Sequence, residues 1–256
     1  KDADKTQITA EARFLRGHYY FELKKSYNDV PYIDETLAPE DVIKVPNNVN
    51  IWPKIEEDFQ FALNNLAEVP SAKGRANKWA AAAYLGKAYL FQKKYAEAKA
   101  QFDAVIANGK TSSGAAYNLL PRYQDLFNAI FDNNEEIIFS VQAAANTGST
   151  NNANPDFVLN FPYNTGTNGP GSCCGFFQPS FELVNSFRVD ANGLPLLDGS
   201  YKNPANELKT DQGIKSYDPK LDTVATGNPT LFTPDTRPVD PRLDHSVGRR
   251  GLPYLD

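Results

Sequence analysis

The sequence predicts a mostly α-helical protein, in which tetratricopeptide-like helical hairpins precede a loop-rich region with short helices and few strands. Apolar residues recur at helical spacing through the first 110 residues. Proline and glycine together contribute nine residues to that part and 25 to the remaining 146. Because these two residue types interrupt regular structure, the front of the chain is expected to be helical and the back to consist largely of loops.

The first helix is predicted from Ile8 to Leu23. One stripe of three- and four-residue steps consists of Ile8, Ala12, Leu15, Tyr19 and Leu23, widened by Phe14 and Phe21. Such a stripe is typical of the buried face of a helix. The pattern stops at Asn28-Asp29-Val30-Pro31, because proline restricts the residue before it to extended geometry. A loop is expected from there to about Asn48.

A second helix is indicated by Pro53, which is suited to a first turn. We interpret Glu56, Glu57 and Asp58 as acidic residues near the helix start, where the helix dipole favours negative charge. The helix is expected to end near Pro70. Its apolar face is predicted to consist of Ile55, Phe59, Ala62, Leu63 and Leu66.

Two further helices, about Arg75 to Gln92 and Ala96 to Asn108, are predicted to form a tight hairpin. Their residues match the 34-residue tetratricopeptide pattern at Trp79, Leu85-Gly86, Tyr89, Ala98 and Phe102. Small residues at Gly86 and Ala98 would let the helices approach closely. The earlier pair resembles the same unit through Gly17, Tyr20, Phe59 and Ala62. Because stacking buries each hairpin's apolar face, we expect further hairpins beside these two.

Beyond Lys110 the predicted elements are short. We expect a helix at Tyr123 to Phe127, a strand at Glu136 to Gln142 and a helix at Pro179 to Phe187, with Phe181, Val184 and Phe187 on one side. Residues Ala143 to Gly175 have no helical or strand period and are expected to form a long loop. Two turns are predicted from the dipeptides Asn192-Gly193 and Asp198-Gly199.

Composition excludes several classes of function. The formal net charge of -5 gives no field that would attract nucleic acid. No apolar run is long enough to span a membrane. The two histidines, His18 and His245, have no ligand-spaced partners, so no metal site and no cofactor are expected. Cys173 and Cys174 are either two plain thiols or a strained vicinal disulfide.

Five separated motifs follow one another along the chain. They are Ala10 to Arg16 with His18 to Phe21 and Tyr27 to Pro31, Gly74 to Lys78 with Tyr95 to Ala98, Tyr123 to Phe127 with Asn134 to Gln142, Gln178 to Phe187, and Asp240 to Leu243. In this order the motifs resemble the SusD/RagB family of outer-membrane nutrient-binding lipoproteins, and the resemblance covers essentially the whole chain. Asn28 stands where that family usually has glycine, and asparagine tolerates the left-handed conformation well.

The resemblance implies a protein at the cell outer membrane, surface-exposed and held by a lipid on a segment outside this chain. It also implies a partner, a SusC-like TonB-dependent transporter that such proteins cover as a lid. Family members are typically about twice this length, so we expect both ends of the full domain to be missing. Residues 1–110 are expected to form the helical frame and residues 111–256 a ligand-binding region of the same domain.

A glycan binder needs aromatic faces for sugar C–H groups and planar amides or carboxylates for adjacent hydroxyls. The loop around residue 160 offers both. Our candidates for ligand binding are Phe157, Asn160, Phe161, Tyr163 and Asn164, then Phe176 and Phe177, and then Tyr32 and Asp34 in the loop after the first helix. For every ring the alternative is that it packs against the core.

Other residues whose chemistry could bind a ligand or catalyse a reaction are interpreted as structural. Trp52 and Trp79 fall where rings close helix packing, and Arg13 and Arg16 are expected to hold a neighbouring carboxylate. His18 is expected to be a helix residue that is satisfied or half-buried. Asp190 and Asp198 sit beside turn glycines. Asp240, Asp244, His245 and Ser246 are too crowded in sequence for a catalytic triad, so no catalytic residue is predicted.

The leading hypothesis is therefore a non-catalytic glycan-binding protein that delivers oligosaccharide to a TonB-dependent outer-membrane transporter. A family member that captures peptides is the first alternative. A tetratricopeptide scaffold for protein partners is the second, and a glycoside hydrolase is the third.

Overall fold

A computed structural model of the chain describes residues 2–142, 179–203, 205 and 237–247. These residues divide between two compact units, one ending at Gln142 and one beginning at Ala143. The elements in chain order are α1 (Asp2–Tyr27), η1 (Pro39–Lys44), α2 (Trp52–Asn65), α3 (Lys78–Phe91), α4 (Tyr95–Asn108), η2 (Tyr123–Phe127), η3 (Ala129–Phe131), α5 (Phe181–Ser186), η5 (Ser200–Lys202) and α6 (Leu243–Ser246). No helix among the described residues is long and apolar enough to cross a membrane.

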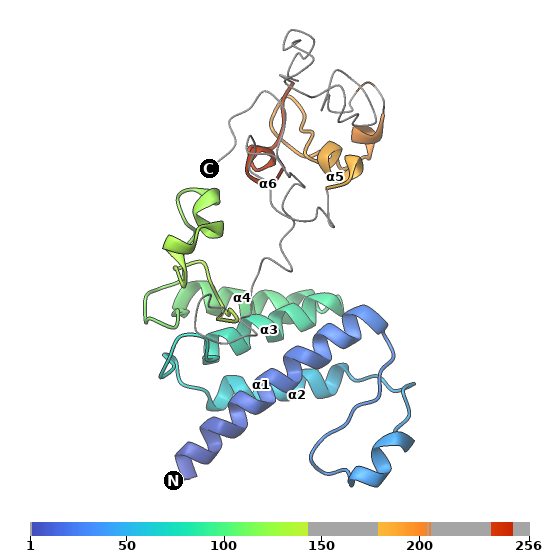
Figure 1. Ribbon diagram of the computed structural model, residues 1–256, viewed down its shortest axis with the longest axis vertical. Helices are drawn as coiled ribbons and strands as arrows, with labels where there is room; N and C mark the ends of the chain where they lie inside the picture. Colours follow the sequence, from blue (N-terminus) through green and yellow to red (C-terminus); the bar gives the residue numbers. More distant parts are fainter. Residues whose placement is uncertain (1, 143–178, 204, 206–236, 248–256) are drawn as a thin grey trace, which may run out of the picture. The chain divides into compact units, whose positions relative to one another are not determined.

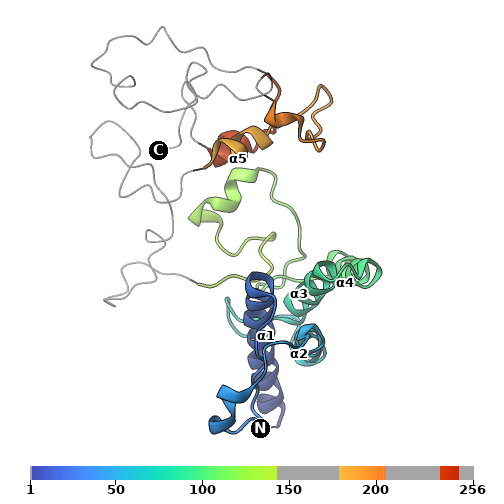
Figure 2. The same ribbon diagram turned by 90° about the vertical axis from the view of Figure 1, so that its right-hand side faces the viewer.

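The first unit is built on four helices that pack consecutively, α1 on α2, α2 on α3 and α3 on α4 (Figure 1). Seen from the side, α1 and α4 lie at the two outer positions (Figure 2). The predicted mostly helical fold with tetratricopeptide-like hairpins is confirmed. Within the described ranges, β-structure is limited to isolated bridges such as Lys110 with Ala116.

Helix boundaries follow local chemistry. Asn77 caps α3 by accepting a hydrogen bond from the amide of Ala80 at 2.7 Å, and a run of alanines continues the helix. Lys93, with φ of 61°, turns the chain from α3 into α4. Asn28 ends α1 in the left-handed conformation, at φ of 60°, as its place in the predicted turn suggested.

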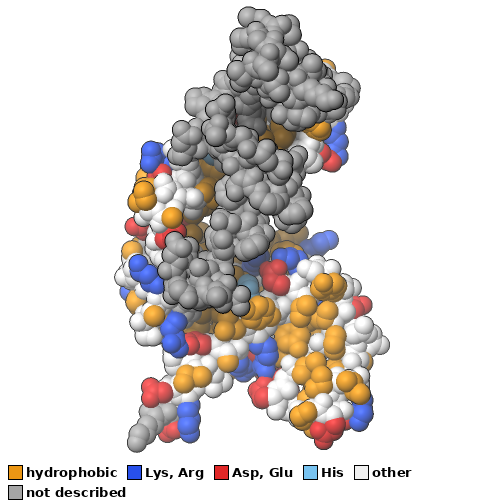
Figure 3. All heavy atoms as spheres, viewed as in Figure 1, with side chains coloured by type: hydrophobic (Ala, Val, Ile, Leu, Met, Phe, Trp, Pro, Cys, Tyr) orange, Lys and Arg blue, Asp and Glu red, His pale blue; other side chains and the backbone are white. Residues whose placement is uncertain are grey.

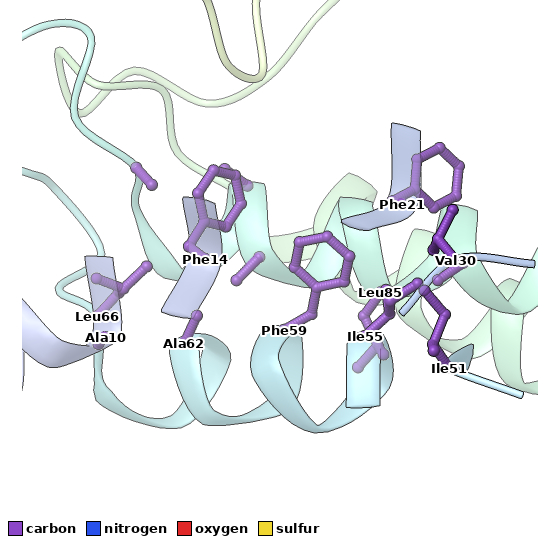
Figure 4. Close-up of a cluster of buried hydrophobic side chains, with 14 residues drawn as sticks. Ala10, Phe14, Phe21, Val30, Ile51, Ile55, Phe59, Ala62, Leu66 and Leu85 are labelled. Carbon is purple, nitrogen blue, oxygen red and sulfur yellow. The ribbon is translucent and has the colours of Figure 1, made fainter. Parts of the chain in front are cut away.

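The core lies between α1, α2 and α3. Phe14 and Phe21 of α1, Phe59 of α2 and Leu85 of α3 are fully buried in one cluster, and Figure 4 shows their side chains directed into it. Burying a side chain of this size contributes about 1.5 to 3 kcal/mol of hydrophobic free energy. Trp79 is 8% exposed and Trp52 packs edge-on against Phe21, so both tryptophans have the predicted structural role.

In each hairpin, a glycine of the first helix faces a phenylalanine ring of the second. A Cβ at Gly86 would lie 2.9 Å from a ring carbon of Phe102, and a Cβ at Gly17 would lie 3.0 Å from a ring carbon of Phe59. A contact of 2.9 Å is shorter than real Cβ contacts and one of 3.0 Å is tighter than nearly all of them, so a Cβ at either position would force the facing ring to shift. The small-residue positions identified in the sequence therefore set the distance between the paired helices.

The buried face of α1 agrees with the prediction at Phe14 and Phe21 and differs from it elsewhere. Ile8 and Tyr19 are 61% and 64% exposed, and Ala12, Leu15 and Leu23 are exposed as well. The buried face instead runs through Ala10, Phe14, Gly17 and Phe21. Both faces are apolar, and the contact between Gly17 and Phe59 decides which of them meets α2.

Two smaller predictions are also corrected. Helix α2 begins at Trp52, so Glu56, Glu57 and Asp58 lie beyond its first turn. Residues Glu136 to Gln142 form no strand, and no neighbouring strand exists among the described residues to pair with them. Phe139 packs instead against Phe14, with ring centroids 5.0 Å apart.

The segment from Lys110 to Gln142 belongs to the first unit because it is tied to the helices. Besides the Phe139 contact, Asn77 donates its side-chain amide to the carbonyl of Lys110 at 2.7 Å. The short helix predicted at Tyr123 to Phe127 is present as the 3-10 helix η2.

In the second unit, the predicted helix and turns are confirmed. Ser180 caps α5, and Val184 of α5 packs on Leu243 of α6, whereas Phe181 is half exposed. Gly193 and Gly199 have φ of 80° and 77°, which suits both predicted turns.

Replacing Gly86 with Leu should lower the free energy of unfolding by about 2 to 3 kcal/mol, because the added side chain meets the ring of Phe102. Replacing Ala100, which is exposed on α4 of the same hairpin, with Leu is the matched control and should change stability by less than about 0.5 kcal/mol. Urea denaturation followed by circular dichroism measures both. Equal effects of the two substitutions would contradict the proposed close approach.

Candidate functional site

The described part of the candidate site is the loop between α1 and α2, which carries Tyr32 and Asp34. The loop begins where Asn28 closes α1, and the buried Val30 follows. The hydroxyl of Tyr20 on α1 holds the loop in place: it donates a hydrogen bond to the carbonyl of Ile33 at 3.1 Å and accepts one from the amide of Ile33 at 2.8 Å. Further along, η1 projects from the helices and buries no residue (Figure 1).

Beneath this loop lies a buried carboxylate, Asp58 of α2, which is 0% exposed. It accepts hydrogen bonds from Arg13 Nε and from Nε and Nη2 of Arg16, each at 2.7 Å, and from the hydroxyl of Tyr32 at 3.4 Å. We call these four residues the Asp58 cluster. It joins α1, α2 and the loop through charged hydrogen bonds, which are the stronger kind.

Two partly exposed carboxylates supply the remaining negative charge around the cluster. Glu57 pairs with Arg13 at 2.7 Å, and Glu35 of the loop pairs with Arg16. The hydrogen bond to Asp58 raises the pKa of Arg16 against the opposing effect of burial. Burial alone would lower the pKa of Arg13, but its bonds to Asp58 and Glu57 outweigh that effect and raise it. The predicted structural role of both arginines is confirmed by these contacts.

Tyr32 is engaged on its ring as well as at its hydroxyl. Its ring centroid lies 4.7 Å from that of Tyr20, and the charged groups of Arg16 and Lys54 lie 5.6 and 5.8 Å from it. Burial and the neighbouring Asp58 raise the pKa of the Tyr32 hydroxyl, which therefore stays protonated at neutral pH. Only part of the half-buried ring is left to meet a ligand.

Asp34 shapes the loop locally. One of its oxygens, Oδ1, accepts from the amide of Thr36 at 3.0 Å and from the hydroxyl of Thr36 at 2.6 Å. These two bonds lower the pKa of Asp34, first through the hydroxyl and then through the amide. The carboxylate is thus ionised at neutral pH and half-exposed, which suits an acceptor for a hydroxyl group.

The other candidate residues lie outside the described residues. They are Phe157, Asn160, Phe161, Tyr163, Asn164, Phe176 and Phe177. Cys173 and Cys174 fall in the same segment. Of the predicted ligand-binding residues, Tyr32 and Asp34 belong to the described part of the chain.

Residues with catalytic or metal-binding potential have structural contacts. Asp190 accepts from the amides of Asn192 and Leu194, and Asp198 accepts from the amide of Ser200, so both carboxylates stabilise turns. Ser246 donates its hydroxyl to the carbonyl of Arg242 at 2.8 Å, and Asp240 pairs with Arg242. In the described part of the chain, no group of three or more histidine, cysteine or acidic residues is placed to hold a metal ion.

His18 is half-buried on α1, with its ring centroid 5.3 Å from those of Tyr19 and Tyr84. Burial lowers its pKa, so the ring is neutral at pH 7. It is packed among aromatic rings, in agreement with the predicted role of a half-buried helix residue.

The comparisons with known proteins agree with this architecture. Two family descriptions match separate parts of the chain: SusD-like_3, described as "Starch-binding associating with outer membrane", at residues 1–90, and SusD_RagB, described as "SusD family", at residues 135–255. The chain therefore belongs to the SusD/RagB family. The first of the two descriptions names starch binding and association with the outer membrane.

Named relatives support the assignment. The starch-binding protein SusD of Bacteroides thetaiotaomicron is 28% identical over 242 residues, which cover 85% of this chain and 40% of that protein. A SusD-like protein of Bacteroides ovatus is 26% identical over 195 residues, covering 73% of this chain and 35% of the relative. The chain thus spans less than half the length of these relatives.

One solved structure is similar enough to compare in shape. It was determined with a xylogluco-oligosaccharide, and it superposes with a TM-score of 0.56 at 26% identity. The match covers 74% of this chain and 39% of the other.

Replacing Asp58 with Asn should lower the free energy of unfolding by about 3 kcal/mol or more, because Arg13 and Arg16 would lose the fully buried counter-charge that they share and keep only the exposed Glu57 and Glu35. Its neighbour Glu57, whose side chain is 56% exposed, provides the control. Glu57→Gln should cost less than about 1 kcal/mol. Urea denaturation of both variants is the measurement, and a small effect of Asp58→Asn would contradict the role of the cluster.

Proposed function

We propose that this chain is part of a non-catalytic glycan-binding protein of the outer membrane, which passes oligosaccharide to a SusC-like TonB-dependent transporter. The observation that carries the proposal is the match of 74% of the chain to a solved structure determined with a xylogluco-oligosaccharide. The relative SusD is itself named as starch-binding, which supports the same class of ligand.

Within this proposal, the helical frame and the ligand-binding loops have different roles. The polar groups of the Asp58 cluster are occupied: its charged hydrogen bonds join α1 to α2, and the hydroxyl of Tyr32 is part of it. The main contact with sugar is therefore assigned to the segment containing Phe157, Phe161 and Tyr163.

The chemistry of that segment suits a sugar. Aromatic rings offer flat apolar faces to the C–H groups of a pyranose, and the amides of Asn160 and Asn164 both donate and accept hydrogen bonds. Phe176 and Phe177 are two further aromatic residues in the same part of the sequence. Asp34, ionised and half-exposed at the loop after α1, is a further acceptor for hydroxyl groups.

Replacing Tyr163 with Ala should weaken oligosaccharide binding about tenfold, which corresponds to about 1.4 kcal/mol. Phe161→Ala should act in the same direction. Isothermal titration calorimetry against xyloglucan and starch oligosaccharides measures the affinity. Tyr95→Ala is the control, because Tyr95 is an exposed aromatic residue on α4, at 63%, and should leave the affinity unchanged.

The same titration separates the alternatives. Binding of peptides and of no polysaccharide would replace the glycan proposal with a peptide-capturing family member. An affinity for every ligand that is untouched by Tyr163→Ala would indicate a scaffold for protein partners. Sustained release of reducing sugar by the purified chain would indicate a glycoside hydrolase.

A further inference from the structure

The first unit ends in a closed loop, residues 133–142, which we call the latch loop. Its two ends are joined by a reciprocal pair of amide hydrogen bonds. Asn133 Nδ2 donates to Gln142 Oε1, and Gln142 Nε2 donates to Asn133 Oδ1, each at 3.1 Å. The side chain of Gln142 also packs on Gly74, where a Cβ would lie 2.7 Å from the Cγ of the glutamine. These contacts make the latch loop a compact element of its own.

The ring of Phe139 packs the latch loop against α1 and α3. It lies edge-on to three other rings, with its centroid 5.0 Å from that of Phe14, 6.2 Å from that of His18 and 6.3 Å from that of Tyr84. Phe14 is fully buried, so Phe139 covers part of the core on this side. A change in the state of His18 therefore acts on the contact that holds the latch loop.

His18 is a titratable group inside this aromatic contact. Its Nδ1 is buried and has no hydrogen-bond partner among the described residues. The rings of Tyr19 and Tyr84 lie 5.3 Å from its own. A neutral imidazole tolerates such surroundings, whereas an imidazolium has two N–H donors and a charge that need water or an acceptor.

The charged groups of the helices give a protonated His18 little support. Glu22 of α1 is the carboxylate that acts on it, but this residue is already paired with Lys25. Lys87 of α3 places its ammonium group 5.6 Å from the centre of the Tyr84 ring, so a second cation beside that ring is repelled. On the surface of the helical unit, basic side chains lie beside hydrophobic ones (Figure 3).

The latch loop supplies no compensating charge either. Its carboxylates, Glu135 and Glu136, are not among the described groups that shift the pKa of His18, and Glu136 accepts from the amide of Leu120 at 3.0 Å. Burial has the largest influence and lowers the pKa of His18 below its ordinary value of 6.5. Glu22 opposes this effect, whereas the neighbouring lysines add to it.

Of the elements around His18, the latch loop is the one that can leave most easily. Tyr84 belongs to α3, where the next residue, Leu85, is fully buried in the core. Phe139 is only half-buried. Opening a loop requires less free energy than separating packed helices. Water therefore reaches a protonated His18 most readily when Phe139 leaves.

We propose that His18 is a pH-sensitive switch for the latch loop: protonation of its ring releases Phe139 from α1 and α3, and deprotonation lets the loop close again. Such a switch needs a histidine that the closed form holds in its neutral state. The closed form has the lower pKa, so its stability is full above pH 6.5 and is lost as the pH falls below that value. This inference does not depend on the proposed glycan binding.

Hydrogen exchange of the 256-residue chain at pH 7.5 and pH 5.0 tests the switch. The reporters are the amides of Ile137 and Asn118, which donate to the carbonyls of Asn134 and Glu135. Their protection factors, which remove the intrinsic effect of pH on exchange, should fall about fivefold or more at pH 5.0. The amides of α3 should keep their protection, because the helices stay packed.

Three variants isolate the histidine and its contact. His18→Phe keeps a ring and removes the titration, so protection of the latch loop should differ by less than about twofold between the two pH values. His245→Gln changes the other histidine of the chain and should keep the response of the parent. In Phe139→Ala the latch ring is gone, so the pKa of His18 measured by NMR should rise towards 6.5.

Four results would overturn the inference. Equal protection of the latch loop in the parent chain at both pH values would exclude a switch. A response that persists in His18→Phe would assign it to another group. An equal loss of protection in α3 would indicate unfolding of the whole helical unit. An unchanged pKa of His18 in Phe139→Ala would show that the ring and the histidine are not coupled.

Discussion

The frame depends on one repeated contact, a glycine of one helix against a phenylalanine ring of the next. At Gly17 and Gly86 the ring carbons of Phe59 and Phe102 lie 3.0 and 2.9 Å from where a Cβ would be. This close approach fixes both the spacing and the rotation of each helix in its hairpin. The burial of Phe14 and Phe21, and the exposure of Ile8 and Tyr19, follow from that rotation.

Much of this frame could be predicted from the sequence, because the tetratricopeptide pattern places small and large residues at the positions where paired helices touch. What periodicity could not decide was the orientation of α1. Both of its sides repeat at helical spacing, and an isolated pattern does not say which of two apolar stripes meets the neighbouring helix. Gly17 was the informative residue, since a glycine inside a helix lowers its stability unless a close contact requires it.

The candidate site was less predictable, for a reason seen in Asp58. In sequence this residue resembles its neighbours Glu56 and Glu57, but it alone is completely buried. Its partners Arg13, Arg16 and Tyr32 lie 26 to 45 residues away in the chain. Local pattern cannot reveal such a contact. The same limit applies to Glu136 to Gln142, where alternation suggested a strand but packing of Phe139 on Phe14 prevails.

Stability and ligand recognition are thus assigned to different parts of the molecule. The Asp58 cluster saturates the polar groups beneath the loop after α1, and removing Asp58 would take from Arg13 and Arg16 the buried carboxylate that they share. The residues of the Asp58 cluster are therefore poorly suited to binding a ligand reversibly. We therefore propose that glycan recognition falls to residues outside the Asp58 cluster, where side chains can change without weakening the contacts between α1 and α2.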